Sequence, residues 1–391
     1  MTFDAWWLLA IRLFFILGWF AARFDARQSG VGGGMPDAYF RGLNFLLNEQ
    51  PDKAIDAFID VVQVDPETIE LHFALGNLFR RRGETDRAIR VHQNLIERRD
   101  LDAEQREHAL FELGQDFLRA GLIDRAEDAF NRLEGSRYRA AALHHRLQLA
   151  QMVRDWPQAI EIAKRLQLDL GENRSHELAQ FHCERAAAAL AADGADAAAT
   201  AIEAITLATE ADPQHPRPWL MRGELALRDD KPEQALAAWE RMLELSPPHA
   251  SLIAVSWLDA SRRTGRLDEG LARLEAIGAS APSIDVFRAV FDARRARDGV
   301  DSAVEWAEAI LRDWPSLLAL ETLLAAGAEG RDPHERARDD LIRSLAKDQA
   351  DRLGRYVCSY CGFKARTYYW QCPGCSHWDS YAPRRGEGIG E

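Results

Sequence analysis

Four of the five cysteines stand near the end of the chain, in two Cys-x2-Cys pairs separated by ten residues: Cys358, Cys361, Cys372 and Cys375. Two such pairs can place four thiolates around one ion, at the tetrahedral geometry typical of structural zinc sites. Four thiolates leave no open coordination position, so the spacing predicts a structural site with one zinc ion per chain. Two disulfides are the alternative, and they require an oxidising compartment.

The second pair, Cys372-Pro-Gly-Cys375, resembles a knuckle of rubredoxin, whose iron transfers electrons. Rubredoxins have a much longer stretch between their two knuckles than the ten residues found here. The sequence therefore favours a short zinc ribbon over residues 355–383, followed by a flexible tail over 384–391. Iron, with membrane-bound electron transfer as the function, is the alternative.

Other side chains surround these cysteines. Gly362 and Gly374 stand in the knuckles, where tight turns require a positive φ. His377 lies two residues beyond Cys375, and with four cysteines available we expect it at the surface rather than as a ligand. The aromatic residues exceed what so small a core needs, so we expect some of them to pack on the last repeat of the preceding array: Tyr356, Tyr368, Tyr369, Trp370 and Trp378.

No other residues form a recognisable catalytic set. Cys183 lies alone on a predicted helix, without a histidine or an acid at the spacing of a nucleophile, and is interpreted as a small buried hydrophobe. The chain contains no His-Glu-x-x-His, no P-loop and no Gly-x-Ser-x-Gly motif. We therefore predict that the protein is not an enzyme.

The residues before the ribbon form an internal repeat. Gly42 is followed by Ala54 and Phe58, and the pattern begins again 34 residues later with Gly76 and Ala88. This is the tetratricopeptide (TPR) pattern, in which each unit is a pair of antiparallel helices. The small-residue position of the first helix falls at 42, 76, 114, 147, 189, 223, 258 and 291, and a last helix pair covers 316–350.

Such units stack because none can bury its apolar face alone, and the stack forms a superhelix with a concave groove. We predict an all-α solenoid of eight to nine helix pairs over residues 35–350, with Phe58 and Phe130 between neighbouring units. The first helix of each unit would line the groove. Its candidate residues, for which ordinary solvated side chains are the alternative, are Asn77, Arg80, Arg81, Gln115 and Arg119.

The N-terminus predicts a membrane anchor. Residues 5–22 are apolar except for Arg12, and eighteen helical residues span about 27 Å, enough for a bilayer core. Arg12 near mid-span either has a function or extends its charge to the interface. We predict an uncleaved transmembrane helix over 1–23 and a flexible, glycine-rich linker over 24–34.

The positive charges near this span predict its orientation. Arg23 and Arg27 follow the span and no basic residue precedes it, which places the N-terminus outside and the bulk of the chain in the cytoplasm. A reducing cytoplasm in turn favours metal over disulfides.

The net charge of −13 lies in the middle of the chain. Residues 1–34 carry +1 and residues 351–391 carry +2, which leaves −16 for the array. An acidic body repels the phosphates of nucleic acids, so we expect protein partners and no nucleic acid.

Anchor, repeats and ribbon in this order resemble one family, lipopolysaccharide assembly protein B of Gram-negative bacteria. The stretches that carry the resemblance are NFLLNEQPDKAIDAF, LGNLFRRRGETDRAIRVHQ, AGLIDRAEDAFNRL and CGFKARTYYWQCPGC with Trp378. The resemblance implies an inner-membrane adaptor that regulates lipopolysaccharide synthesis. It would bring the deacetylase that commits precursor to lipid A to a membrane AAA+ metalloprotease, under the control of a further membrane protein. It also implies that the four ribbon cysteines bind the metal, and it leaves self-association open.

Overall fold

The computed structural model describes residues 19, 37–48, 50–64, 69–192, 196–327, 333–353 and 355–386. The predicted anchor, including Arg12 but not Trp19, and the predicted linker lie outside these residues. Within the described ranges, no helix combines the length and the apolar character that a bilayer crossing needs.

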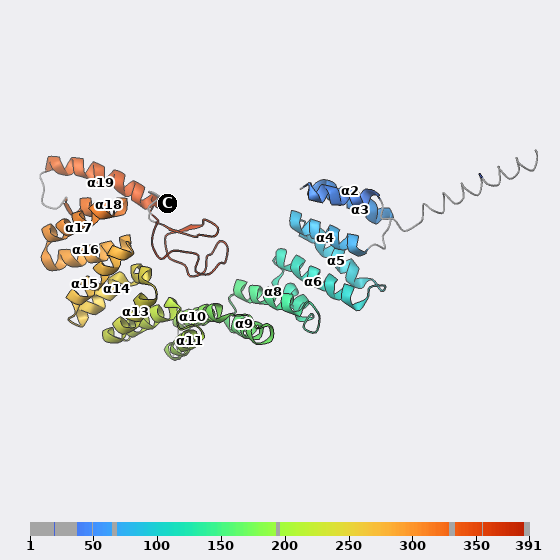
Figure 1. Ribbon diagram of the computed structural model, residues 1–391, viewed down its shortest axis with the longest axis horizontal. Helices are drawn as coiled ribbons and strands as arrows, with labels where there is room; N and C mark the ends of the chain where they lie inside the picture. Colours follow the sequence, from blue (N-terminus) through green and yellow to red (C-terminus); the bar gives the residue numbers. More distant parts are fainter. Residues whose placement is uncertain are drawn as a thin grey trace, which may run out of the picture. The chain divides into compact units, whose positions relative to one another are not determined.

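The described chain is helical from residue 37 to residue 353 and divides into two compact units (Figure 1). The first unit, Met1–Val153, contains helices that follow one another in hairpins. Their bounds are α2 Asp37–Leu47, α3 Pro51–Val64, α4 Ile69–Arg82, α5 Thr85–Glu97, α6 Ala103–Arg119, α7 Ile123–Asn131 and α8 Arg139–Met152.

The second unit, Arg154–Glu391, continues the helical repeat and ends in the ribbon. Its first helices are α9 Trp156–Leu170, α10 Ser175–Ala191, α11 Ala197–Ala211, α12 Pro216–Arg228 and α13 Pro232–Leu245, with the short 3-10 helix η2 Pro247–His249. The remaining helices are α14 Ala250–Arg263, α15 Leu267–Ser280, α16 Ile284–Asp298, α17 Val300–Asp313, α18 Leu317–Gly327 and α19 Pro333–Leu353.

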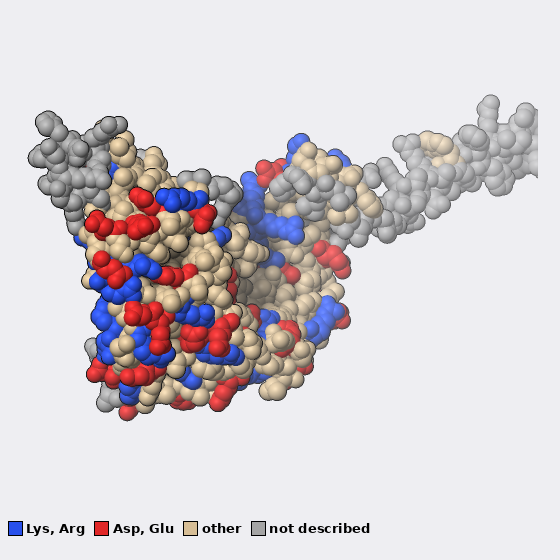
Figure 2. All heavy atoms as spheres, turned by 60° about the vertical axis from the view of Figure 1, so that its left-hand side comes forward, with Lys and Arg blue, Asp and Glu red and all other residues tan. Residues whose placement is uncertain are grey.

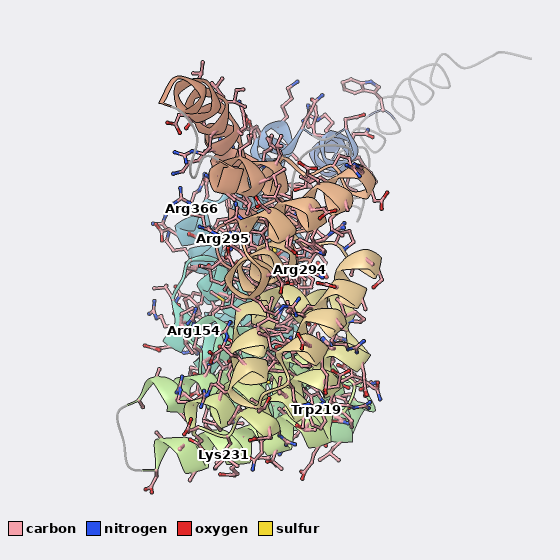
Figure 3. The ribbon with its side chains drawn as sticks, turned by 90° about the vertical axis from the view of Figure 1, so that its left-hand side faces the viewer. Arg154, Trp219, Lys231, Arg294, Arg295 and Arg366 are labelled. Atoms are coloured by element: carbon pink, nitrogen blue, oxygen red, sulfur yellow. The ribbon has the colours of Figure 1, made fainter. Side chains whose placement is uncertain are left out.

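The outer surface of the second unit carries charges of both signs. Figure 2 shows basic and acidic side chains interspersed over the visible face. Arg294 of α16, labelled in Figure 3, donates to Glu275 at 2.7 Å and lies 5.6 Å from the centroid of the Trp306 ring. Because solvent-accessible ion pairs at a protein surface contribute only about 0–1 kcal/mol each, apolar packing rather than surface charge holds the helices together.

In several hairpins, a recurring position of the repeat pattern places a glycine of the first helix against a ring of the second helix. A Cβ atom added to Gly42 of α2 would lie 2.4 Å from the Phe58 ring of α3, and one added to Gly223 would lie 2.2 Å from Trp239. Only glycine lets the two helices approach this closely. The same relation joins Gly76 to His92 and Gly114 to Phe130.

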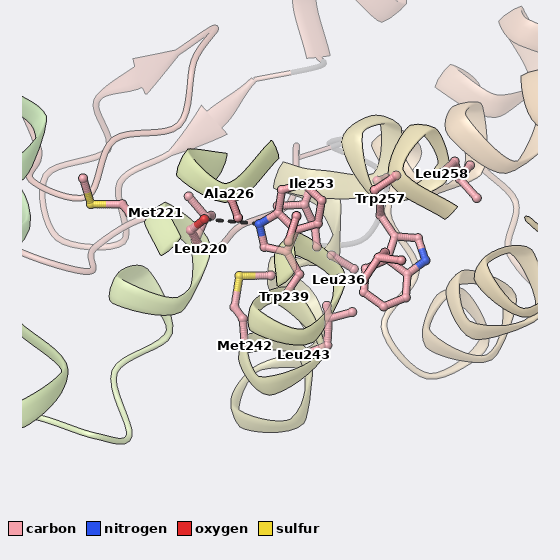
Figure 4. Close-up of a cluster of buried hydrophobic side chains, with 14 of the residues drawn as sticks. Leu220, Met221, Ala226, Leu236, Trp239, Met242, Leu243, Ile253, Trp257 and Leu258 are labelled. Atoms are coloured by element: carbon pink, nitrogen blue, oxygen red, sulfur yellow. Dashed lines mark hydrogen bonds between the residues drawn. The ribbon is translucent and has the colours of Figure 1, made fainter. Parts of the chain in front are cut away.

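Large aromatic side chains fill the space within and between the hairpins. The Phe130 ring stacks on His145 of the next hairpin, with ring centroids 4.9 Å apart, as the repeat pattern predicts. In the second unit, Trp239 is fully buried and donates from Nε1 to the Leu220 carbonyl at 3.2 Å (Figure 4). Truncation of such a side chain to alanine typically costs about 3–5 kcal/mol, so these rings are principal sources of stability.

The ribbon contains the strands of the described chain. Strand β1, Tyr356–Val357, pairs antiparallel with β2, Lys364–Ala365. Isolated bridges join Cys358 to Tyr381 and Gln371 to Trp378. The loops that carry the two cysteine pairs therefore lie next to each other. The protein is therefore mostly helical, with one small ribbon at its end.

Candidate functional site

The four ribbon cysteines meet at one point. All four Sγ atoms lie within 4.8 Å of one another. The Sγ atoms of Cys358 and Cys375 are 3.7 Å apart, and so are those of Cys361 and Cys372. Tetrahedral coordination with metal–sulfur bonds of about 2.3 Å requires sulfur–sulfur distances of about 3.8 Å. The geometry of the thiols therefore fits one tetrahedral ion.

The backbone around the cysteines favours thiolates. Desolvation opposes ionisation of Cys358, but hydrogen bonds from Ser380 and from the N–H groups of Cys361 and Tyr360 lower its pKa to about 6. The Gly374 N–H lies 3.4 Å from the Cys372 Sγ atom. Donors aimed at sulfur stabilise the charged form, which is the form that binds metal.

The turns of the knuckles are made in part by different residues than expected. Gly362 has a φ of 74°, as predicted, whereas Gly374 does not adopt a positive φ. A Cβ atom at Gly374 would lie 3.2 Å from Phe363, so close approach is the reason for glycine there. Ser376 and Asp379 adopt positive φ values of 59° and 50° instead.

His377 lies at the surface, in agreement with the prediction. Its side chain is not in the cluster of metal-binding candidates, and its ring stacks on Tyr360 with centroids 3.4 Å apart. Cys183 is fully buried, and burial raises its pKa to about 12. A buried thiol with such a pKa is inert at neutral pH, which agrees with the role of a small hydrophobe.

The ribbon docks on helix α10 of the second unit through the side chain of Asp379. The Gln180 amide of α10 donates to both oxygens of this carboxylate, at 2.9 and 3.0 Å. His176, one turn earlier, places Nε2 2.6 Å from the same carboxylate and Nδ1 3.2 Å from Asp212. Hydrogen bonds to Asp379 raise the pKa of His176 to about 9, so the imidazole is protonated at neutral pH.

Two tryptophans extend this contact. Trp370 stacks on His249 with centroids 5.2 Å apart and an interplanar angle of 6°, and the Arg217 guanidinium lies 5.4 Å from its centroid. Trp378 packs edge-on against Trp156 and Phe181. The expectation that ribbon aromatics pack on the last repeat was wrong, because these partners lie between α9 and α14.

The contact also continues beyond the expected end of the ribbon. Ser251 of α14 donates to the Pro383 carbonyl, and Arg385 donates to Asp285 of α16 at 3.1 and 3.2 Å. A bridge joins Arg355 to Gly386. Residues 384–386, expected in a flexible tail, thus contribute to docking.

One group at this interface resembles a second metal site. His176, His215 and Asp379 offer three ligand atoms within 4.8 Å of one another. However, Nδ1 of His215 accepts the Arg217 backbone N–H at 3.1 Å, so in the neutral ring Nε2 carries the proton. That nitrogen faces Asp379 at 4.0 Å and has no lone pair for a metal. The group therefore serves as a polar contact of the docked ribbon.

The groove residues predicted in the first unit lie close together. An open cavity of about 560 Å³ is lined by Arg80 and Arg81 of α4, Gln115 and Arg119 of α6, and further residues of α6 and α8. Asn77 does not line it, but accepts a hydrogen bond from Arg80 at 2.6 Å. The other lining residues are Leu118, His145, Gln148 and Met152.

A buried polar network beneath this cavity was not predicted. Arg80 donates to Asp116 at 2.8 Å, and Asp116 lies 2.5 Å from Nδ1 of the fully buried His92. Burial opposes ionisation of Glu112, but hydrogen bonds from His108 and Arg80 lower its pKa to about 2. The signal in the sequence was His92 itself, which stands where other repeats carry Phe58, Phe130 or Trp239.

Known proteins resemble parts of this chain. Residues 356–383 match a family described as the rubredoxin metal binding domain. Among solved structures, the C-terminal part of a TPR repeat-containing protein from Cytophaga hutchinsonii aligns with a TM-score of 0.39 and 14% identity, covering 62% of this chain and 94% of that one. A tetratricopeptide repeat protein from Parabacteroides merdae aligns with a TM-score of 0.28 and 11% identity, covering 80% and 98%.

Sequence relatives cover both the array and the ribbon. Lipopolysaccharide assembly protein B of Haemophilus influenzae is 28% identical over 379 residues, which cover 94% of each chain. The protein of the same name from Escherichia coli K12 is 34% identical over 382 residues, covering 94% of this chain and 95% of that one. Since this identity extends over nearly the whole of both chains, the chain belongs to the lipopolysaccharide assembly protein B family.

Proposed function

We propose that this protein is a membrane-anchored adaptor that regulates lipopolysaccharide assembly by promoting proteolysis. In this role it brings the deacetylase that commits precursor to lipid A to a membrane AAA+ metalloprotease, and a further membrane protein controls it. The observation that carries the proposal is the docking of the ribbon on α10, α12, α14 and α16, which joins repeats and ribbon into one binding platform. Family membership supports the link to lipopolysaccharide.

The metal has a structural role in this proposal. Cys358, Cys361, Cys372 and Cys375 would hold one zinc ion, which supplies the folding free energy that so small a ribbon lacks. The folded ribbon presents Trp370, Trp378 and Asp379 to the helices. Purified chain that is colourless and carries one equivalent of zinc agrees with this role. Visible absorption of ferric thiolate with reversible reduction would instead support electron transfer.

The anchor confines the adaptor to the inner membrane, with the N-terminus in the periplasm and the repeats in the cytoplasm. Confinement of adaptor and protease to one surface raises their effective concentration without any new contact. A reporter that is active only in the periplasm, fused to the C-terminus, should be inactive. An active reporter would reverse the orientation and make disulfides the expected state of the cysteines.

The function is tested by the half-life of the deacetylase in cells. Cells that lack this chain should accumulate the deacetylase and overproduce lipopolysaccharide, and the intact gene should restore rapid turnover. A chain without residues 1–34, expressed at the normal level, should fail to restore it. A half-life that is the same with and without the chain would contradict the proposal.

A further inference from the structure

The two units present two comparable inner surfaces, and the chain itself occupies one of them. In the second unit, Gln180 and His176 of α10 bind the Asp379 carboxylate. Arg217 of α12 and His249 of η2 contact the neighbouring Trp370. This surface thus recognises an acidic side chain next to an apolar one. In the first unit, the corresponding helices α4, α6 and α8 line the open cavity.

Amide side chains form a ladder on the three helices around this cavity, of which Gln115 and Gln148 line it. Asn77, Gln115 and Gln148 each stand one residue after the small-residue position of their helix, at 76, 114 and 147. Equivalent positions of successive repeats lie in a row along the same face of the stack. In the second unit the same positions carry Leu190, Glu224, Asp259 and Asp292, so the amides are confined to the helices around the cavity.

Two guanidinium groups at the cavity have no partner in the described part of the chain. Arg81 and Arg119 each stand five residues after the small-residue position, are exposed, and make no hydrogen bond or ion pair with the described residues. Arg80, in contrast, is committed to Asp116 and Glu112. Other arginines of the first unit are paired as well: Arg82 with Asp52, Arg87 with Glu84, and Arg137 with Glu104.

The surroundings favour a carboxylate over a phosphate. The cavity lies at the C-terminal ends of α4, α6 and α8, where the negative end of each helix dipole disfavours a dianion and no free N–H groups point outward. Burial lowers the pKa of His145, which therefore adds no charge. Leu118 and Met152 provide apolar surface beside the arginines.

We infer that this cavity binds an extended, acidic segment of a partner protein. Carboxylates of the segment pair in bidentate fashion with Arg81 and Arg119, because the planar guanidinium matches the two carboxylate oxygens. Gln115 and Gln148, which line the cavity, form hydrogen bonds with the peptide backbone, and Leu118 and Met152 contact an apolar side chain of the segment. The inference rests on the proposed adaptor function, since it names the chemistry by which a client is recruited.

The test is a selection of random twelve-residue peptides against the full chain purified in detergent. Enriched peptides should be rich in Asp and Glu next to an apolar residue. The double variant Arg81→Glu, Arg119→Glu should bind them at least about tenfold more weakly, the effect of losing about 1.4 kcal/mol. Arg132→Glu is the matched control, because Arg132 is exposed at the C-terminal end of α7 and does not line the cavity.

A second pair of variants separates binding from folding. Arg81→Lys with Arg119→Lys keeps the charge but loses the bidentate geometry, and should weaken binding less than the glutamate variant. The melting temperatures of both double variants should match that of Arg132→Glu. Peptides without acidic excess, no enrichment at all, or equal binding to the glutamate variant would overturn the inference. So would displacement of the peptides by inorganic phosphate beyond the effect of chloride at equal ionic strength.

The adaptor function and the peptide-binding cavity are tested by different measurements. Peptide binding by the purified chain does not depend on the protease, so it tests the cavity alone. If loss of the whole chain leaves the turnover of the deacetylase unchanged, the adaptor function is contradicted, whether or not the purified chain binds peptides. Normal turnover with Arg81→Glu, Arg119→Glu, in cells where loss of the chain stops it, would contradict recruitment through this cavity.

Discussion

The His176 imidazole of α10 and the Asp379 carboxylate of the ribbon form a charge-assisted hydrogen bond, with 2.6 Å between Nε2 and Oδ2. Gln180 binds the same carboxylate, and the Asp379 N–H donates to the Trp370 carbonyl at 2.8 Å. Asp379, which contacts the helices, is thus bonded to the backbone of Trp370, the tryptophan that stacks on His249. The fold of the ribbon and its docking are therefore linked through one residue.

Asp379→Asn should loosen the docked ribbon. The amide keeps the shape but loses the charge that His176 and Gln180 bind, which typically costs roughly 1–3 kcal/mol for a hydrogen bond to a charged group. Hydrogen exchange of the ribbon amides should accelerate accordingly, while metal content stays unchanged. Arg366→Gln, at an exposed position of the ribbon, is a control; equal exchange in both variants would show that Asp379 does not hold the ribbon.

Docking should depend on pH in a defined window. The pKa of His176 is raised to about 9, so its contribution is complete below about 6.5 and is lost as pH rises through about 9. Burial lowers the pKa values of His215 and His249 to about 4, so their contribution is complete above about 6.5 and is lost as pH falls toward 4. The ribbon should be most firmly docked near pH 6.5, where both contributions are complete.

Tryptophan fluorescence against pH checks this window, because undocking exposes Trp370 and Trp378 to water. His176→Gln should remove the alkaline limb of the profile and leave the acid limb in place. A profile that keeps its alkaline limb in this variant would assign that limb to another group.

Cys372→Ser should unfold the ribbon without unfolding the helices. Loss of one thiolate removes the metal-derived folding free energy, while repeats contact mainly their neighbours. Far-UV circular dichroism should change little, the fluorescence of Trp370 and Trp378 should shift to the red, and metal content should fall. Cys183→Ser is the control and should keep full metal content. A large loss of helix would show that ribbon and repeats unfold together.

Gly114→Ala should destabilise the first unit. The added methyl group would lie 2.7 Å from the Phe130 ring, and such overpacking costs about 1–3 kcal/mol, more than the roughly 1 kcal/mol that alanine gains as a helix former. Urea denaturation should show a lower midpoint. Gly135→Ala, at a position with open space around it, should leave the midpoint near that of the parent chain; equal midpoints for the two variants would refute the packing argument.

The repeats and the cysteine cluster were predictable because their signals are local or periodic. Gly42, Gly76, Gly114 and Gly223 recur with the residues that pack against them. Each Cys-x2-Cys pair needs only one turn to bring its two sulfurs together, and all four sulfurs lie within 4.8 Å of one another. The groove candidates followed from the same register.

Long-range docking could not be predicted in the same way. Nothing near Asp379 in the sequence indicates that His176 and Gln180 will bind it, since the partners come together only when the helices stack. The sequence did show an excess of aromatic residues in the ribbon, but it contained no signal for which helices would receive them. His92 shows a third case, in which a departure from the repeat pattern marked a buried network.

The docked ribbon also has a consequence for how the protein is made. His176 and Asp379 are separated by 203 residues, and ribosomes add about 5–20 residues per second, so roughly 10–40 s pass between their syntheses. During that interval the helices that carry Trp156, Phe181 and His249 have folded, but the ribbon that covers these side chains has not yet been made. A newly made chain therefore carries an uncovered aromatic surface until its last segment leaves the ribosome. A chain that ends early keeps that surface, which is what chaperones and proteases recognise as unfinished.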